Sequence, residues 1–558
     1  MVSPRQIWLT SYRHPTAWDQ QFAPLSAPAM FEASASRVPD APLIDFMGRK
    51  FSYAEVASGA DRVACGLAAL GVRPGDRIGL FLPNVPHYVA AYYGALKLGA
   101  VVVNFSPLYS VDELAHQVED SDTRILFTLS ATALLPTAIK VMERSRIERL
   151  VVGSVAGALS GAKSLIYRWF RSKDVAARPR DPRIIAFSSL IDNEGGFVPP
   201  AIDPERDIAL IQYTGGTTGT PKGAMLTHQA LTANARQLVA IDPHRHETDR
   251  MIGVLPLFHI FANACVLNRT VLNGGEIVML PRFDAGQVLA AIHRTRATSL
   301  PGVPTMYQAL LDHPRLARSD LSSLRLCISG GAPLPMAVKE RFEAATGAIL
   351  TEGYGLTESG IASCNPAEGL NKSGTIGQPL PATEFRLLDR EDPHRPAREG
   401  EPGEIAIAGP QVMVGYWNQP ELKDRAFING ALRTGDVGLI DEDGYIRVVD
   451  RMKDMISVGG FKVFPSQVEA LLYHHPAVRE ALVIGLPDTY HGEMPKAFVT
   501  LVEGSTATGN ELRDWLNPQL GKHERVIAVE IRPALPKTLV GKLSRKELVA
   551  EERAKAGM

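Results

Sequence analysis

A strand-like run followed at once by a glycine-rich loop constrains this chain more than any other feature. The segment Ile211–Leu226 reads IQYTGGTTGTPKGAML. Glycines, hydroxyls and a lysine (Lys222) gathered behind a strand are typical of loops that hold phosphate groups with backbone N–H groups. The loop lacks the Gly-Lys-Ser/Thr ending of the P-loop of kinases and GTPases. It therefore predicts a phosphate site of another kind within an α/β fold.

The segments on either side of this loop indicate a layered fold. Residues 41–200 alternate apolar runs of helical and strand period, as in FSYAEVASGADRVACGLAALGV, a helix for which Ser52 is the expected cap, and the strand-like DRIGLFLPN. Such alternation is typical of a mainly parallel sheet covered by helices. We expect the glycine-rich loop to lie in a similar unit of strand, glycine turn and helix, with Thr227 at the helix N-cap.

The pattern changes twice toward the C-terminus. From about residue 374 short strands alternate with Gly-, Pro- and Asp-rich turns, which predicts a small antiparallel or barrel-like subdomain. From residue 451 helices and strands resume, and Pro465 is well placed to open a helix. We therefore expect a large N-terminal domain, 1–450, and a small α+β C-terminal domain. The expected divisions are α/β subdomains at about 1–200 and 201–373, a β-rich subdomain at about 374–450, and the C-terminal domain at 451–558.

Composition argues against several classes of protein. A formal net charge of −1 over 558 residues gives no general attraction to nucleic acid. The four cysteines are far apart and form no CxxC pair, which argues against a zinc site or a disulfide framework. The first residues hold no apolar core of signal-peptide length, and the uncharged stretches are too short to span a bilayer. These features predict a cytoplasmic protein that does not cross a membrane.

One basic segment stands apart from this balanced composition. Residues 163–183 carry seven Lys and Arg against two Asp, a local net charge of 7 − 2 = +5, with large apolar residues such as Trp169 among them. The segment is either a solvated surface helix or an interfacial element that meets anionic lipid on the inner face of the membrane.

Five further motifs resemble the loop in composition, and together with it they are far more specific than any one alone. They are SGGAPLP (329–335), TEGYGLTES (351–359), RTGD (433–436), DRMKDMISVGGFKVFPSQVE (450–469) and LPKTLVGKLSRKEL (535–548). With these motifs, and with the near-literal family phrases QYTGGTTGTPKGAMLTH and LPLFHIFA, the chain resembles the adenylate-forming (acyl-activating) enzyme superfamily. It is most similar to bacterial long-chain fatty acid–CoA ligases, and the resemblance covers nearly the whole chain in the family's motif order.

The resemblance implies a role for each nucleotide-binding residue. The loop would hold the departing pyrophosphate of ATP, and Tyr354 would lie against adenine. Thr357 would contact the α-phosphate, while Asp436 and Arg451 would hold the ribose. Glu358 would coordinate Mg²⁺, with Thr214 as a second ligand, since Mg²⁺ is usually held by one or two carboxylates and phosphate oxygens. The other implied ATP-binding residues are Gly215, Gly216, Thr217, Thr218, Gly219, Lys222, Gly331, Ala332, Pro333, Glu352 and Gly355.

The remaining implied residues serve catalysis and the second half-reaction. Lys542 matches the family's catalytic lysine, whose point charge suits the charge that develops at the α-phosphate. Lys453 sits at the hinge about which the C-terminal domain would rotate, and Gly460 matches a glycine that lets CoA pass close to the backbone. His259 resembles the gate beside the acyl carboxylate. The stretches PLFHIFANACVL and GIASC would line the acyl pocket.

These residues imply an ATP-dependent ligase that activates a medium- to long-chain fatty acid as acyl-AMP and transfers the acyl group to CoA, with Mg²⁺ as cofactor. A ligase for a dicarboxylic or aryl acid would keep every nucleotide motif, and an acyl-AMP ligase that delivers to a carrier protein is a further alternative. A non-catalytic acyl or nucleotide sensor should have lost Lys542, Glu358 or Asp436, and all three are present. Relatives that activate amino acids place an aspartate near His259, where this chain has no acid. A homodimer is left open.

Overall fold

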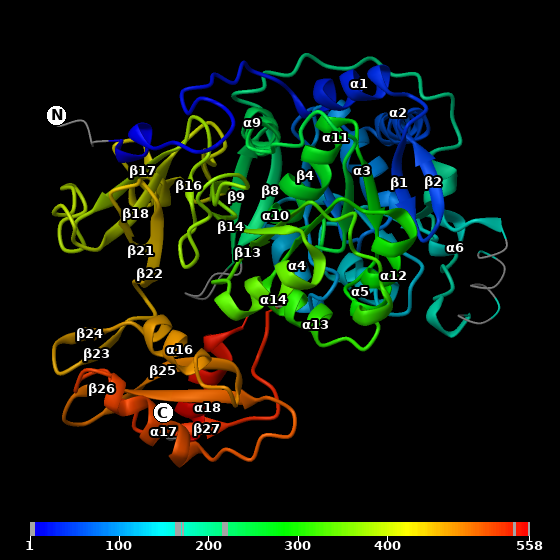
Figure 1. The fold of residues 1–558 in the computed structure, drawn as a ribbon. Coiled ribbons are helices and arrows are strands. Elements are labelled where there is room, and N and C mark those ends of the chain that lie inside the picture. Colours follow the sequence, from blue (N-terminus) through cyan, green and yellow to red (C-terminus); the bar gives the residue numbers. More distant parts are fainter. Residues whose placement is uncertain are drawn as a thin grey trace.

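A computed structural model describes residues 6–161, 164, 169, 172–214, 221–538 and 543–555. In Figure 1 the chain forms two sheets with their helices, a β-rich subdomain beside them, and a separate C-terminal domain. The predicted α/β multidomain fold, with a smaller α+β C-terminal domain, is confirmed. None of the helices within the described residues is long and apolar enough to cross a membrane.

The first sheet has eight strands in the order β19-β9-β8-β4-β3-β5-β6-β7. Six of them, from β8 to β7, run parallel, as the alternation within 41–200 predicted. Ser52 caps α2 (Tyr53–Ala69) in a reciprocal capping box with Glu55, so this boundary is also confirmed. The strands are β3 (Arg77–Leu80), β4 (Val101–Asn104), β5 (Thr123–Leu129), β6 (Arg149–Gly153), β7 (Ile184–Ala186), β8 (Ile208–Thr214), β9 (Lys222–Thr227) and β19 (Gly415–Tyr416). The helices between them are α3 (Pro86–Lys97), α4 (Val111–Asp120), α5 (Leu135–Arg144), α6 (Val155–Ala158) and α8 (Phe187–Leu190).

The glycine-rich loop does not lead straight into a helix, contrary to our expectation. The chain first returns as β9, which pairs antiparallel with β8 so that Thr214 lies opposite Lys222. Gly223 allows this close return, because a Cβ there would lie 2.8 Å from Ile211 Cγ2. The helix α9 (His228–Ala240) follows, and Thr227 caps it by accepting from the Ala230 N–H at 3.1 Å. The loop therefore closes a β-hairpin, and its two ends are held side by side.

The second sheet has nine strands in the order β16-β15-β14-β13-β12-β10-β11-β1-β2. It takes β1 and β2 from the first 52 residues because β1 pairs in parallel with β11. Each sheet therefore contains strands from both sides of residue 200, so the expected division at about residue 200 does not coincide with the division between the two sheets. The strands are β1 (Pro42–Phe46), β2 (Arg49–Ser52), β10 (Arg250–Gly253), β11 (Glu276–Met279), β12 (Ser299–Gly302), β13 (Leu326–Gly330), β14 (Ile349–Leu356), β15 (Gly360–Cys364) and β16 (Gln378–Pro379). The helices are α1 (Ala27–Arg37), α10 (Ile260–Ala262), a π-helix (Asn263–Asn268), α11 (Arg269–Asn273), α12 (Ala285–Thr295), α13 (Pro304–Leu311) and α14 (Met336–Thr346).

The β-rich subdomain is a five-stranded antiparallel sheet, as its turn-rich sequence indicated. Its last two strands, β21 and β22, place Asp436 opposite Arg451. The elements are β17 (Glu384–Leu388), β18 (Gly403–Ala408), α15 (Lys423–Ala426), β20 (Phe427–Ile428), β21 (Ala431–Ile440) and β22 (Ile446–Arg451).

The C-terminal domain is built around a long antiparallel hairpin, β25 with β26, which is covered by helices. Pro465 is the first residue of α16, as predicted. Across the junction between domains, Arg479 forms an ion pair of 3.2 Å with Asp312, just after α13. The elements are β23 (Ile456–Val458), β24 (Phe461–Val463), α16 (Pro465–Tyr473), β25 (Val478–Asp488), β26 (Gly492–Leu501), α17 (Gly509–Leu516), β27 (Val529–Ile531) and α18 (Arg545–Lys555).

Candidate active site

Two glycine-rich loops lie side by side at the carboxyl ends of β13 and β14. These strands are parallel neighbours in which Gly330 pairs with Gly353, so the residues after each strand emerge at the same edge of the sheet. Ligands bind at this edge in open α/β sheets. Gly331 has φ +83°, a conformation that favours glycine, and its loop carries Ala332 and Pro333. The structure thus brings together two segments that the resemblance assigned to ATP binding.

The second loop turns sharply because of Gly355. A Cβ at this position would lie 1.9 Å from the Gly360 carbonyl oxygen, so only glycine allows β14 to fold back against β15 here. This tight hairpin presents Thr357 and Glu358 at its turn. Tyr354 lies just before the turn on the same strand.

Glu352 is a buried carboxyl group at the base of these loops. Its Oε1 accepts a hydrogen bond of 3.2 Å from the Leu334 N–H, which ties the second loop to the first. Burial raises the pKa of Glu352 to about 8, while the Leu334 N–H and Lys339 act in the opposite direction. The carboxyl group is therefore largely protonated at neutral pH.

Glu352→Gln should make the protein less sensitive to alkaline pH. Because folding raises this pKa from 4.5 to about 8, the contribution of the proton to stability is complete below pH 4.5 and is lost as the pH rises to about 8. We expect the melting temperature of the variant, relative to the wild type, to rise between pH 5 and 8 and then to level off. The change corresponds to at most about 5 kcal/mol. Thermal unfolding followed by circular dichroism at each pH measures it.

Glu368→Gln, which changes an exposed glutamate of the same region, is the matched control and should follow the wild type throughout. Parallel pH profiles for Glu352→Gln and the wild type would show that Glu352 is not protonated in the folded protein.

Asp436 joins the β-rich subdomain to the second loop. The Tyr354 hydroxyl donates to Asp436 Oδ2 at 2.6 Å, and Arg451 Nε donates to Oδ1 at 3.2 Å. Asp436 is buried, and burial together with this carboxylate raises the pKa of Tyr354 well above its usual range. A carboxylate has about four acceptor positions, so Asp436 can still accept from two further hydroxyl groups. The three residues that resemblance linked to adenine and ribose therefore lie in one cluster.

Tyr416, which the sequence analysis did not identify, connects Glu358 to the ends of the glycine-rich loop. The Tyr416 hydroxyl donates to Glu358 Oε1 at 2.9 Å, and the Lys222 ammonium group lies 5.3 Å from the centre of the Tyr416 ring. Because Thr214 is paired with Lys222, the loop ends, Tyr416 and Glu358 form one continuous group. Tyr416 enters on β19, and nothing in its local sequence indicates that this strand would add to β9.

The electrostatics of Glu358 suit a cation. Burial raises its pKa, whereas the hydrogen bond from Tyr416 and the charges of Lys222 and Arg451 lower it. One oxygen is engaged by Tyr416, and a cation would favour the ionised form of the group. The described residues contain no cluster of three or more His, Cys, Asp or Glu side chains arranged as a metal site, so the other ligands of a bound ion would have to come from elsewhere, such as phosphate oxygens.

His259 and the residues after it lie beside the end of β13. His259 caps α10, where its Nδ1 accepts from the Phe261 N–H at 3.3 Å. The Phe261 ring packs over Gly330, since a Cβ there would lie 3.1 Å from the ring. The expected gate residue is therefore close to the first nucleotide loop.

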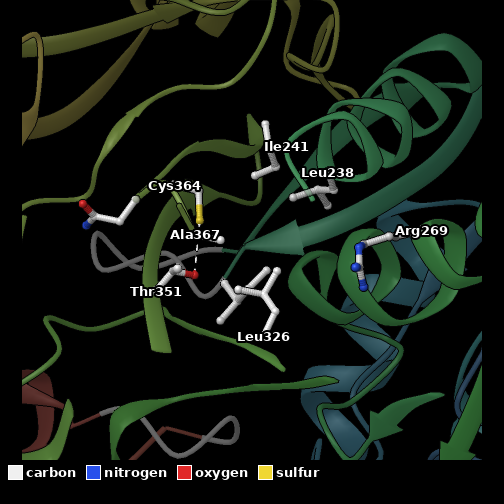
Figure 2. A pocket seen from close by; sticks show the side chains of 9 residues that line it. Leu238, Ile241, Arg269, Leu326, Thr351, Cys364 and Ala367 are labelled. Carbon is white, nitrogen blue, oxygen red and sulfur yellow. Dashed lines mark hydrogen bonds between the residues drawn. The ribbon is translucent and has the colours of Figure 1, made fainter. Parts of the chain in front are cut away.

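A small, mainly apolar cavity lies between α9, β13, β14 and β15 (Figure 2). Ile328 and Thr351, in its wall, precede the two loops by only a few residues on β13 and β14. Cys364 of the predicted pocket stretch GIASC contacts Thr351 across the cavity wall, at 3.5 Å between Sγ and Oγ1. Arg269 also lines the cavity, and it forms buried ion pairs with Asp249 and Asp242. The full lining is Leu238, Ile241, Arg269, Leu326, Ile328, Thr351, Cys364, Asn365 and Ala367.

The residues expected to serve the second half-reaction follow the Asp436–Arg451 pair along the chain. Lys453 is exposed in the turn after β22, where desolvation by its surroundings and the charge of Arg451 lower its pKa. Gly460 lies at the exposed tip of the β23–β24 hairpin with φ +88°. Residues 215–219 of the loop and Lys542 lie outside the described residues, so their positions remain predictions. The same holds for most of residues 163–171.

Comparison with known proteins places this arrangement in a family. Residues 31–417 match the model of the AMP-binding enzyme family, and residues 467–542 match the AMP-binding enzyme C-terminal domain. The chain therefore belongs to the AMP-binding enzymes, and the predicted superfamily is confirmed.

The similarity to relatives within this family extends over nearly the whole chain. The long-chain-fatty-acid–CoA ligase of Bacillus subtilis (strain 168) is 39% identical over 99% of both chains. The ATP-bound crystal structure of MatB from Rhodopseudomonas palustris has a TM-score of 0.83 and 29% identity, and covers 95% of this chain and 99% of MatB. The anthranilate CoA ligase AuaEII in complex with anthranoyl-AMP has a TM-score of 0.86 and 27% identity, and covers 96% of this chain and 99% of that one.

Proposed function

We propose that this protein is an ATP-dependent fatty acid–CoA ligase that forms acyl-AMP and then acyl-CoA. The observation that carries the proposal is the cluster of Tyr354, Asp436 and Arg451 beside the loops of β13 and β14, with Glu358 in the turn after β14 under the influence of the Arg451 charge. A carboxylate bound beside these loops would meet the α-phosphate of ATP. The name of the Bacillus subtilis relative supports a long-chain acid as the substrate.

The described residues would divide the first half-reaction among them. Tyr354 and the loop at Gly331 would hold adenine, and Asp436 would accept hydrogen bonds from the ribose hydroxyls. Thr214 and Lys222 at the ends of the glycine-rich loop would face the departing pyrophosphate. Glu358 would hold Mg²⁺, which would neutralise charge on the phosphate oxygens. Lys542 would stabilise the charge that develops as the carboxylate attacks.

An aryl acid is the second candidate, because the anthranilate CoA ligase AuaEII shares the fold. A dicarboxylic acid would keep every nucleotide-binding residue of the site, so it is tested alongside.

Product analysis tests the proposed function directly. With ATP, Mg²⁺, CoA and fatty acids of C8–C18, the protein should release AMP and pyrophosphate and yield acyl-CoA. Benzoic and dicarboxylic acids in parallel reactions distinguish the alternatives. ADP as the main nucleotide product would exclude an adenylation mechanism, and a preference for benzoate would exclude a fatty acid ligase.

We further propose reversible contact with an anionic bilayer through residues 163–183. Trp169 is 85% exposed, which suits an aromatic side chain that inserts at the membrane interface. Each basic residue near an anionic surface contributes about 1 kcal/mol, so binding should weaken steeply with salt. In liposome flotation the protein should rise with anionic vesicles and not with neutral ones, and Trp169→Ala should bind less. Equal flotation with both kinds of vesicle would refute this contact.

A further inference from the structure

One face of β13 runs from the first nucleotide loop toward the opposite edge of the sheet. Gly330, Ile328 and Leu326 lie on this face, because alternate residues of a strand point to the same side. The four residues from Gly330 to Leu326 span about 13 Å at about 3.3 Å per residue. The Phe261 ring packs over Gly330 and so covers the end of this face that is nearest the loop.

The helical segment 260–273 covers the rest of this face. Cys265 and Arg269 follow Phe261 at intervals of four residues, and Cys265 belongs to the stretch expected to line the acyl pocket. Both residues line a second small cavity together with Ile328 and Leu326. Arg269, Ile328 and Leu326 also line the cavity in Figure 2. Two cavities therefore lie along this face of β13, and the Arg269 side chain borders both of them.

Arg269 is held in place by two carboxylates. It forms ion pairs with Asp242 and, at 2.7 Å, with Asp249, and all three residues are buried. Asp249 also accepts from the Ser299 hydroxyl at 2.7 Å, and Asp242 accepts from the His244 N–H at 2.8 Å. Separating such a pair leaves an unpaired buried charge, which costs several times the free energy that one buried methylene contributes. A bound ligand would therefore not push Arg269 aside.

We infer that Arg269 limits the length of the acyl chain that the enzyme accepts. This inference rests on the proposed function and narrows its substrate class. An acyl chain that enters past Phe261 would lie along β13, where the two small cavities leave the packing incomplete, and it would end against the fixed Arg269 side chain.

The length of this path defines the class of acid. Each methylene of an extended chain advances about 1.3 Å, because C–C bonds of about 1.5 Å meet at about 111°. The span of about 13 Å from Gly330 to Leu326 therefore holds about ten carbon atoms. With the carboxyl group beside the nucleotide loops, the preferred substrate is a medium-chain monocarboxylic acid of about ten to twelve carbons.

Pyrophosphate release with saturated acids of graded length tests this limit. In the wild type, kcat/KM should be highest at about C10–C12 and at least about tenfold lower at C16, because one surplus methylene in an apolar pocket changes kcat/KM by about 10- to 200-fold. The variant that combines Arg269→Ala, Asp242→Asn and Asp249→Asn should raise the ratio of kcat/KM for C16 to that for C10 on the order of tenfold. Changing all three residues together leaves no unpaired charge in the protein interior.

A second triple variant, with Arg269→Met and the same two asparagines, is the length-matched control. It removes the same charges but keeps a long side chain, so its preferred acid should be that of the wild type. Cys265→Met should shift the preference to shorter acids, because it fills the path nearer to Phe261. Cys327→Met is the control for this change and should keep the wild-type preference, since Cys327 lies on the opposite face of β13 in another core cluster.

A wild-type protein that uses C16 as well as C10 would overturn the inference, and so would equal preferences in the two triple variants. If the triple variants do not fold, the two methionine variants decide, and a shift in neither or in both would overturn it. A wild-type protein that releases no pyrophosphate with any acid would instead refute the proposed function.

Discussion

Lys542→Ala should lower the rate of acyl-AMP formation on the order of 10²- to 10³-fold while it leaves transfer to CoA nearly unchanged. The lysine charge would be useful only while negative charge builds up between the attacking carboxylate and the α-phosphate. Removing one preorganised electrostatic contact of this kind costs about 2.7–4 kcal/mol of transition-state stabilisation. Pyrophosphate release measures the first half-reaction, and conversion of supplied acyl-AMP and CoA into thioester measures the second.

Lys546→Ala is the control for this variant, because it removes an exposed lysine only four residues away, on α18. It should leave both half-reactions within twofold of the wild type, about 0.4 kcal/mol. Equal losses in both half-reactions for a folded Lys542→Ala protein would show that Lys542 does not act specifically in adenylation.

Local sequence signals were sufficient to predict those features of the structure that depend only on neighbouring residues. Ser52, Thr227 and Pro465 each begin a helix as predicted, because capping and the fixed φ of proline act within one turn. The close approach at Gly355 has the same local origin, since it involves Gly360 of the same hairpin. Motif resemblance added the superfamily and the clustering of Tyr354, Asp436 and Arg451.

Long-range pairing could not be predicted in this way. The return of the glycine-rich loop as β9 depends on two partners, β8 and β19, and β19 is almost 200 residues away. Tyr416 contacts Glu358 only because of that pairing. The ion pairs of Arg269 could not be predicted for the same reason. Its aspartates precede it by 20 and 27 residues, and no sequence pattern indicates that the three residues form one buried cluster.

Cross-linking the two domains in their present orientation should block transfer of the acyl group to CoA. In this structure the tip of the β23–β24 hairpin is exposed, and Arg479 and Asp312 face each other across the junction between the domains. If CoA reacts only after Gly460 has reached the nucleotide loops, a tether at this junction will prevent the reaction. We expect the protein carrying Asp312→Cys and Arg479→Cys, joined by a reducible bismaleimide linker, to convert supplied acyl-AMP at least about 10²-fold more slowly, as misplaced reacting groups do.

Reduction of the linker should restore the rate, which distinguishes the effect of the tether from the effect of the two substitutions. The loss of the Arg479–Asp312 ion pair should change the free energy of unfolding little, because partly exposed pairs contribute about 0–1 kcal/mol. Each single cysteine variant treated with the same reagent controls for modification without a bridge, including modification of the partly exposed Cys65, whereas Cys265, Cys327 and Cys364 are buried. A bridged protein that forms acyl-CoA as fast as its reduced form would exclude domain rotation as a requirement. The acyl group would then have to reach CoA in the orientation described here, with Gly460 at the exposed tip of the β23–β24 hairpin.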